Sequence, residues 1–102
     1  MDKAMNQVTS EDLFGSYSGL HDSIYDNQSL MVTGTLVYSG PDSYGLPCVE
    51  YGDSDTGQAW VACVLSGADQ LSAGDRVNIT GHVEGFTQGM VVLKHCSIDE
   101  VL

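Results

Sequence analysis

Four aromatic side chains are the residues of this sequence best suited to bind a ligand: Tyr44, Tyr51, Trp60 and Phe86. An exposed ring can stack on a nucleobase, a sugar or an apolar side chain of a protein partner. A structural role is the alternative, because Trp60 and Tyr51 could instead lie under the N-terminal segment or close a protein core. The fluorescence of Trp60 separates the two roles, since an exposed indole emits at longer wavelength than a buried one.

The remaining reactive side chains do not form a known catalytic or metal-binding motif. Residues 53–55 begin like a calcium loop, but Gly57, Gln58 and Val64 stand where an EF-hand needs Asp or Asn, Gly and Glu. The sequence has no Gly-x-Ser-x-Gly elbow and no glycine-rich phosphate loop before a helix. We therefore expect a protein that is not an enzyme and that needs no cofactor.

Histidine and cysteine offer only a weak metal site. His82 and His95 fall on the last two expected strands, beside Cys96, and could be cross-strand neighbours. A metal there would need a further ligand that the pattern does not supply, so a solvent-facing His82 is the alternative. The three cysteines lack Cys-x-x-Cys spacing, which argues against structural zinc.

The charge of the chain restricts its partners. Its 102 residues carry 14 acidic side chains and only Lys3, Arg76 and Lys94 as basic ones, for a net charge of −11. Because nucleic-acid backbones are bound chiefly by Lys and Arg, this balance disfavours them, although Arg76 and Lys94 could form a small local patch. With 42% apolar residues and no apolar run long enough to span a bilayer, we expect one soluble folded domain over residues 1–102.

One helix is expected, over about residues 10–25. Thr9 can cap it, with Asp12 in the capping-box position, and its apolar stripe consists of Leu13, Tyr17, Leu20 and Ile24. Gly15 and Gly19 weaken the helix, so it needs a surface on which to dock.

From Ser29 the hydrophobic period changes to two, which indicates β-strands. We expect five strands, at about residues 30–37, 46–51, 58–65, 76–84 and 90–98, with the third apolar on both faces. Residues 32–36 and 79–83 repeat an apolar-Thr-Gly-x-apolar frame. Gly34 and Gly81 would face inward there and relieve crowding in a tightly coiled barrel, so a barrel is favoured over a sandwich.

Several short segments together resemble a known family, the small bacterial OB-fold proteins called tRNA_anti-like. The segments are residues 8–13, 32–36, 61–63, 71–77, 79–81, 85–86 and 92–98. The resemblance implies a mainly β protein, a five-stranded Greek-key OB-fold barrel over about residues 29–98 with an N-terminal α-helix. It carries no catalytic residues over. Many members are exported or lipid-anchored, so the cellular location stays open, including the mature part of such a protein.

OB barrels bind ligands on the face of their second and third strands, between the loop joining strands one and two and the loop joining strands four and five. The four aromatic residues named above fall on or beside these elements, and the acidic residues concentrate outside the strands and surround that face. The leading interpretation is a binding module for a protein or a neutral small ligand such as a glycan. The alternatives are single-stranded nucleic acid, which the family name implies, and a structural subunit of an envelope assembly.

The OB strand order also brings Cys63 and Cys96 together, because strands three and five are neighbours. In an exported protein these two residues could form a disulfide and leave Cys48 unpaired. In a reducing compartment all three would stay thiols, and buried free cysteine is the structural alternative.

Overall fold

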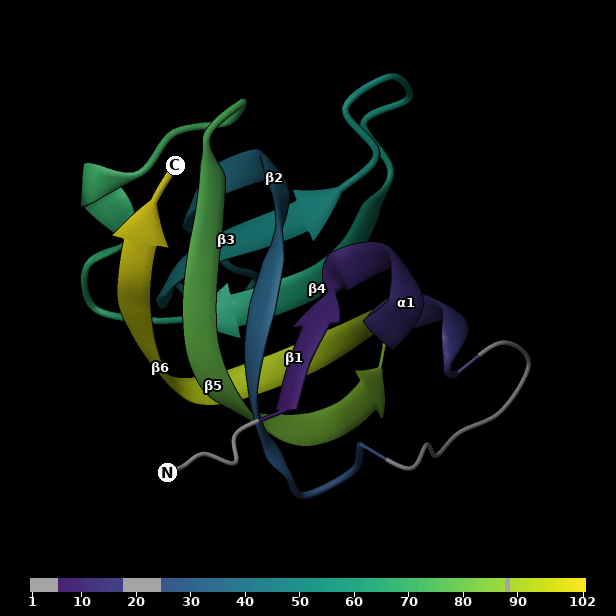
Figure 1. Cartoon of the computed structure of the whole chain (residues 1–102). Helices are drawn as coiled ribbons and strands as arrows, with labels where there is room; N and C mark the ends of the chain where they lie inside the picture. Colours follow the sequence, from purple (N-terminus) through teal and green to yellow (C-terminus); the bar gives the residue numbers. More distant parts are fainter. Residues whose placement is uncertain (1–5, 18–24, 88) are drawn as a thin grey trace.

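The polypeptide folds into a small closed β-barrel with a short helix packed on it (Figure 1). A computed structural model describes residues 6–17, 25–87 and 89–102. In chain order the elements are β1 (Asn6–Thr9), α1 (Ser10–Gly15), β2 (Ser29–Pro41), β3 (Pro47–Gly52), β4 (Ala59–Val64), the 3-10 turn η1 (Ala68–Gln70), β5 (Arg76–Thr87) and β6 (Met90–Val101).

The barrel closes through the strand order β2-β3-β4-β6-β5, with β5 pairing back onto β2. Only the β4–β6 pair within this ring is parallel, and the other pairs are antiparallel. This arrangement confirms the predicted five-stranded OB-fold barrel. Among the described residues, no helix has the length and apolar character needed to cross a membrane.

Strict alternation of apolar side chains explains the two long central strands. On β2 the inward residues Leu30, Val32 and Leu36 are buried, and on β5 Val77 and Ile79 are buried in the same way. The two strands pair in antiparallel register, Val32 opposite Ile79 and Gly34 opposite Val77. The two copies of the repeated sequence pattern therefore lie on neighbouring strands, and their apolar residues face the same core.

Tyr51 fills the interior of the barrel. Its side chain is fully buried, and its hydroxyl lies 2.8 Å from the Val32 carbonyl oxygen and 3.0 Å from that of Val77. Gly34 makes room for the ring, because a Cβ there would lie 3.0 Å from Tyr51 Cδ1 and 2.5 Å from Ser10 Oγ. The prediction that Gly34 relieves crowding is thus confirmed, with Tyr51 and Ser10 as the crowding groups.

An additional strand, β1, was not expected from the sequence. It runs parallel to β2, with Asn6 opposite Leu30 and Thr9 opposite Thr33. It occupies the edge of β2 that β3 leaves free, because β3 pairs with β2 only from Leu36 onward. The strand is only four residues long, and Val8 is buried between exposed Gln7 and Thr9, which is too little pattern to reveal a strand.

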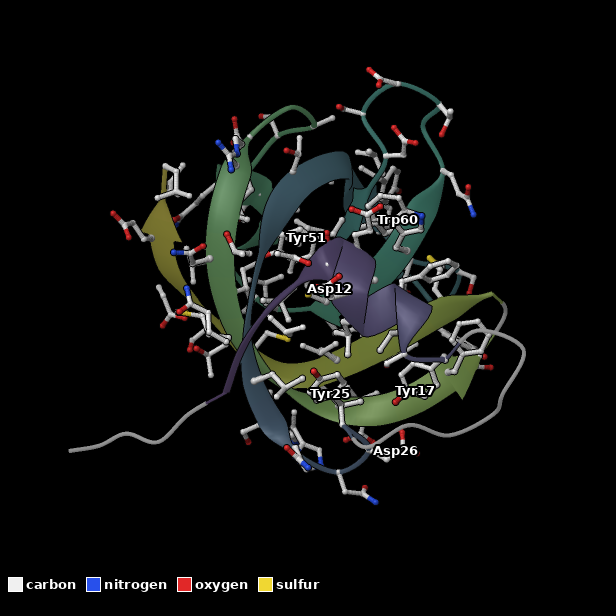
Figure 2. The ribbon with its side chains drawn as sticks, turned by 45° about the vertical axis from the view of Figure 1, so that its right-hand side comes forward. Asp12, Tyr17, Tyr25, Asp26, Tyr51 and Trp60 are labelled. Carbon is white, nitrogen blue, oxygen red and sulfur yellow. The ribbon has the colours of Figure 1, made fainter. Side chains whose placement is uncertain are left out.

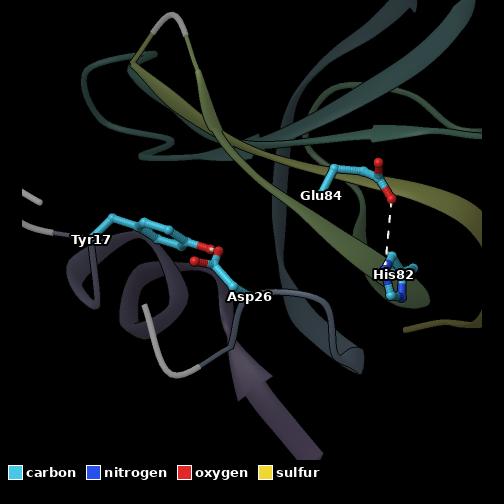
Figure 3. A network of polar contacts seen from close by, with 4 residues as sticks. All are labelled: Tyr17, Asp26, His82 and Glu84. Atoms are coloured by element: carbon cyan, nitrogen blue, oxygen red, sulfur yellow. Dashed lines mark hydrogen bonds and ion pairs between the residues drawn. The ribbon is translucent and has the colours of Figure 1, made fainter. Parts of the chain in front are cut away.

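The helix begins as predicted and ends earlier. Thr9 is the N-cap, and its hydroxyl accepts a hydrogen bond of 3.1 Å from the Asp12 backbone N–H. The helix ends at Gly15, so the expected length over residues 10–25 was wrong, while Leu20 and Ile24 lie outside the described residues. Leu13 and Tyr17 still join the core. The Tyr17 hydroxyl donates to the Asp26 carboxylate, which ties the end of this segment to the approach to β2 (Figure 3).

Gly34→Ala should destabilise the protein by about 1–3 kcal/mol. The new methyl group would overpack the barrel against the Tyr51 ring, which cannot move away because its backbone and its hydroxyl are both fixed by hydrogen bonds. Gly15→Ala is the matched control: a Cβ there meets nothing within 4 Å, so it should be neutral or stabilise the helix by up to about 1 kcal/mol. Urea unfolding of both variants measures the difference. Equal stability of the two variants would contradict this account of the core.

Candidate binding groove

A groove lies on the outer face of β3, β4 and β6, and its volume is about 400 Å³. Its floor consists of Cys48, Ala62, Val64 and Val92, which alternate with fully buried core residues. Asp42, Ser43, Tyr44 and Leu46 from the β2–β3 loop line one end, and Thr87 and Met90 beside the β5–β6 hairpin line the other. This is the face on which the sequence predicted a ligand, between the two expected loops.

The β2–β3 loop has a defined shape. Asp42 Oδ1 accepts hydrogen bonds from the backbone N–H groups of Tyr44 and Leu46, at 2.8 and 2.9 Å. Gly45 adopts a φ of +82°, which completes the turn at little steric cost. The Asp42 carboxylate therefore positions the loop, and the Tyr44 ring stands at its tip with 81% of its surface exposed.

The groove floor is largely uncharged. Burial, followed by the nearby Glu50 and Asp42 charges, raises the pKa of the Cys48 thiol to about 12, so this group stays neutral. Burial also raises the pKa of Glu50, which lines the groove on β3. Among the described lining residues, Lys94 alone is basic.

A second hollow of about 230 Å³ extends the groove over β5. It shares Thr87, Val92 and Lys94 with the first and adds the segment 84–86. Glu84 from this hollow lies 3.8 Å from His82, measured between Oε2 and Nε2 (Figure 3). Together the two hollows form an elongated surface that passes Lys94, and we call both together the outer groove.

The structure separates the four aromatic residues that the sequence grouped. Tyr44 lies on the groove rim, but Tyr51 points into the barrel and cannot contact a ligand on the outer face, so its predicted binding role was wrong. The reason is alternation on β3, where Cys48 and Glu50 face outward and Tyr51 must face inward. Figure 2 shows Tyr51 behind α1 inside the barrel and Trp60 beside that helix.

Trp60 and Phe86 belong to an aromatic cluster around α1. The Phe14 ring lies 6.1 Å from the Trp60 ring and 6.1 Å from that of Phe86, and the Tyr17 ring stacks on Phe86 at 5.3 Å. Trp60 is half-buried and does not line the groove. Trp60 therefore has the structural role that was the alternative to ligand binding. Phe86 packs in the same cluster and also lines the second hollow.

Sequence reasoning missed the groove floor itself. The available signal was the third expected strand, apolar on both faces, because Ala62 and Val64 on β4 face outward while Val61 and Cys63 are buried in the core. A contiguous apolar patch on an outer face marks a candidate interaction surface.

The suggested charge patch and the metal-site candidates do not assemble. Lys94 on β6 pairs with His82 on β5. His82 is six residues from Arg76, a separation of roughly 20 Å along the strand, so the suggested Arg76–Lys94 patch was wrong. Within residues 6–17, 25–87 and 89–102, no three His, Cys, Asp or Glu side chains come together as metal ligands. Asp53 instead shapes a turn, where its Oδ1 accepts from the Asp55 N–H at 2.8 Å.

The tRNA_anti-like family model matches residues 1–97, nearly the whole chain. No curated protein matches the sequence.

Phe14→Ala should shift the fluorescence of the single tryptophan to longer wavelength, because removing the stacked ring exposes the Trp60 indole to water. Tyr44→Ala, in the exposed loop, is the control and should leave the emission maximum unchanged. An unchanged spectrum in Phe14→Ala would show that the two rings do not pack.

Glu50→Gln should stabilise the protein at neutral pH and not in acid. Folding raises the pKa of Glu50 by burial, so its charged form opposes folding, and this opposition disappears once pH falls below the pKa of the unfolded state. Thermal melts at about pH 7 and about pH 3.5 test this, with exposed Glu100→Gln as a control for general charge repulsion. A gain at neutral pH no larger than that of Glu100→Gln would refute the burial effect.

Proposed function

The chain belongs to the tRNA_anti-like family of OB-fold domains, and on that premise we propose that it is a non-enzymatic module that binds an apolar or neutral segment of a protein partner. The binding surface in this proposal is the outer groove. The observation that carries it is the apolar floor, which lies between the two loops that OB-folds use for binding.

The shape of the outer groove supports an extended polypeptide as the ligand. Cys48 and Ala62 are small and almost fully buried, so they form a low floor, and Val64 and Val92 add apolar surface. Side chains of a partner would gain about 25 cal/mol for each Å² of apolar surface that they bury there. The continuation past Lys94 into the second hollow suits a chain better than a compact molecule.

A glycan fits this surface less well. Sugars are usually held by an exposed aromatic ring together with several polar groups. Tyr44 supplies a ring, but Tyr51 is buried and Trp60 is engaged by Phe14. The floor offers apolar groups and a neutral thiol in place of hydrogen-bonding side chains.

Single-stranded nucleic acid is the second candidate, favoured by the family name and by Lys94 in the groove. The charge distribution opposes it. Glu50 and Glu84 flank Lys94 along the outer groove, and the whole chain carries a net charge of −11. A polyanion in the outer groove would be repelled by these carboxylates, and Lys94 is the one cationic side chain among the described lining residues that could offset the repulsion.

Three probes test the proposal: neutral peptides selected from a random displayed library, a chitin oligosaccharide, and a fluorescein-labelled oligo-dT at low salt. We expect the peptides to bind and the other two not to bind. Ala62→Trp should weaken peptide binding at least about tenfold by filling the groove, and Tyr44→Ala should weaken it by removing a rim contact.

Ala73→Trp is the matched control, because Ala73 is exposed in the loop before β5 and does not line the groove. It should leave the affinity within about twofold of the original. Binding of oligo-dT lost on raising the salt would favour the nucleic-acid candidate. Peptide binding that Ala62→Trp leaves unchanged would place the site elsewhere.

A further inference from the structure

We propose that Cys63 and Cys96 are a reactive thiol pair that a peroxide oxidises to a disulfide between β4 and β6. This inference is independent of the proposed binding function. It rests on how the backbone of two strands brings a partly exposed thiol onto a buried one.

Cys63 lies where the pairing of two barrel strands ends. Its side chain is fully buried on β4, and its backbone is opposite Leu93 in the parallel β4–β6 register. That register contains three residue pairs, from Val61–Val91 to Cys63–Leu93. Beyond Cys63 the register ends, which leaves a seam between the two strands that backbone pairing does not close.

A β-bulge on β6 turns Cys96 into this seam. Thr80 pairs with Ser97 and His82 with Lys94, so two residues of β6 lie opposite Gly81 alone. One of the two is His95, whose φ of +53° is in the left-handed region. Such a bulge bends the strand and redirects its side chains.

Gly81 provides the space that Cys96 occupies. A Cβ at position 81 would lie 2.6 Å from Cys96 Sγ and 3.1 Å from Leu93 Cδ2. The second inward glycine of the repeated frame therefore has a specific role, which is to admit the sulfur atom of Cys96 into the barrel wall.

The two thiols lie close enough to change each other's pKa. The interaction with Cys96 raises the pKa of the Cys63 thiol, and burial raises it further. The same interaction lowers the pKa of the Cys96 thiol, against the opposing effect of burial. Cys96 is the more exposed of the two and the one that ionises more readily, so it is the nucleophile.

The chemistry needs only a peroxide such as hydrogen peroxide. The Cys96 thiolate attacks one peroxide oxygen, the O–O bond breaks, and Cys96 sulfenic acid and one water form once the leaving hydroxide takes a proton. The Cys63 sulfur then attacks the Cys96 sulfur and displaces the second oxygen as water, while the Cys63 proton goes to that water. In total two thiols and one hydrogen peroxide give one disulfide and two waters.

This bond would join β4 to β6 beneath the groove. Ala62 and Val64 on β4, and Val92 and Lys94 on β6, line the outer side of the same seam. A covalent link at Cys63 and Cys96 would therefore hold the two halves of the groove floor together.

Mass spectrometry of the intact chain tests the proposal directly. After treatment with hydrogen peroxide and without reductant, we expect a loss of about 2 Da, reversed by dithiothreitol. Trypsin cuts after Arg76 and Lys94, which leaves Cys96 on the peptide 95–102 and both other cysteines on the peptide 4–76. The oxidised sample should contain these two peptides joined.

The Cys48→Ser variant identifies the partner and serves as the matched control. It should still form the joined peptides, whereas Cys96→Ser should not. Oxidation should also raise the melting temperature of the original chain by about 10 °C, which needs no variant. A bridge that disappears in Cys48→Ser, a disulfide-linked dimer, or overoxidation of Cys96 without a bridge would each overturn the proposal.

Discussion

The barrel depends most on one buried side chain, Tyr51. Its ring occupies the interior, and its hydroxyl lies between carbonyl oxygens of β2 and β5, so this residue of β3 contacts two further strands of the barrel. Burial raises the pKa of the phenol, which keeps it protonated and able to donate. Gly34 is required beside the ring. Because Tyr51 faces inward, Cys48 and Glu50 face outward, and the groove exists on that outer side.

Features governed by local alternation could be predicted from the sequence, and features governed by tertiary contacts could not. The five barrel strands and the inward glycines followed from period-two patterning. The strand β1 was not predicted, because it is defined by its pairing with β2, a contact between segments far apart in the sequence. The inward direction of Tyr51 had a usable signal, since charged Glu50 must face water and its neighbour must then face the core. The stacking of Phe14 on Trp60 had none, because it depends on where the helix docks.

The same barrel wall serves the groove and the thiol pair. On the outer side, small apolar residues of β4 and β6 form a floor, with Lys94 between acidic neighbours. On the inner side, Gly81 and the bulge at His95 allow Cys96 to reach Cys63. The floor of the groove is largely neutral, which is compatible with an apolar partner. The net negative charge of the whole chain is unfavourable for a polyanion.

The central claim is that the outer face of β3, β4 and β6 is the binding surface. Mapping of amide chemical shifts by NMR tests this claim most directly. Titration of the 15N-labelled protein with a selected neutral peptide should move the amide signals of Tyr44, Ala62, Val64 and Val92 most. Signals of α1 and of the Arg76 end of β5 should stay in place. The largest shifts at α1 and Trp60, or a response to oligo-dT at the groove residues in place of the peptide, would contradict the account.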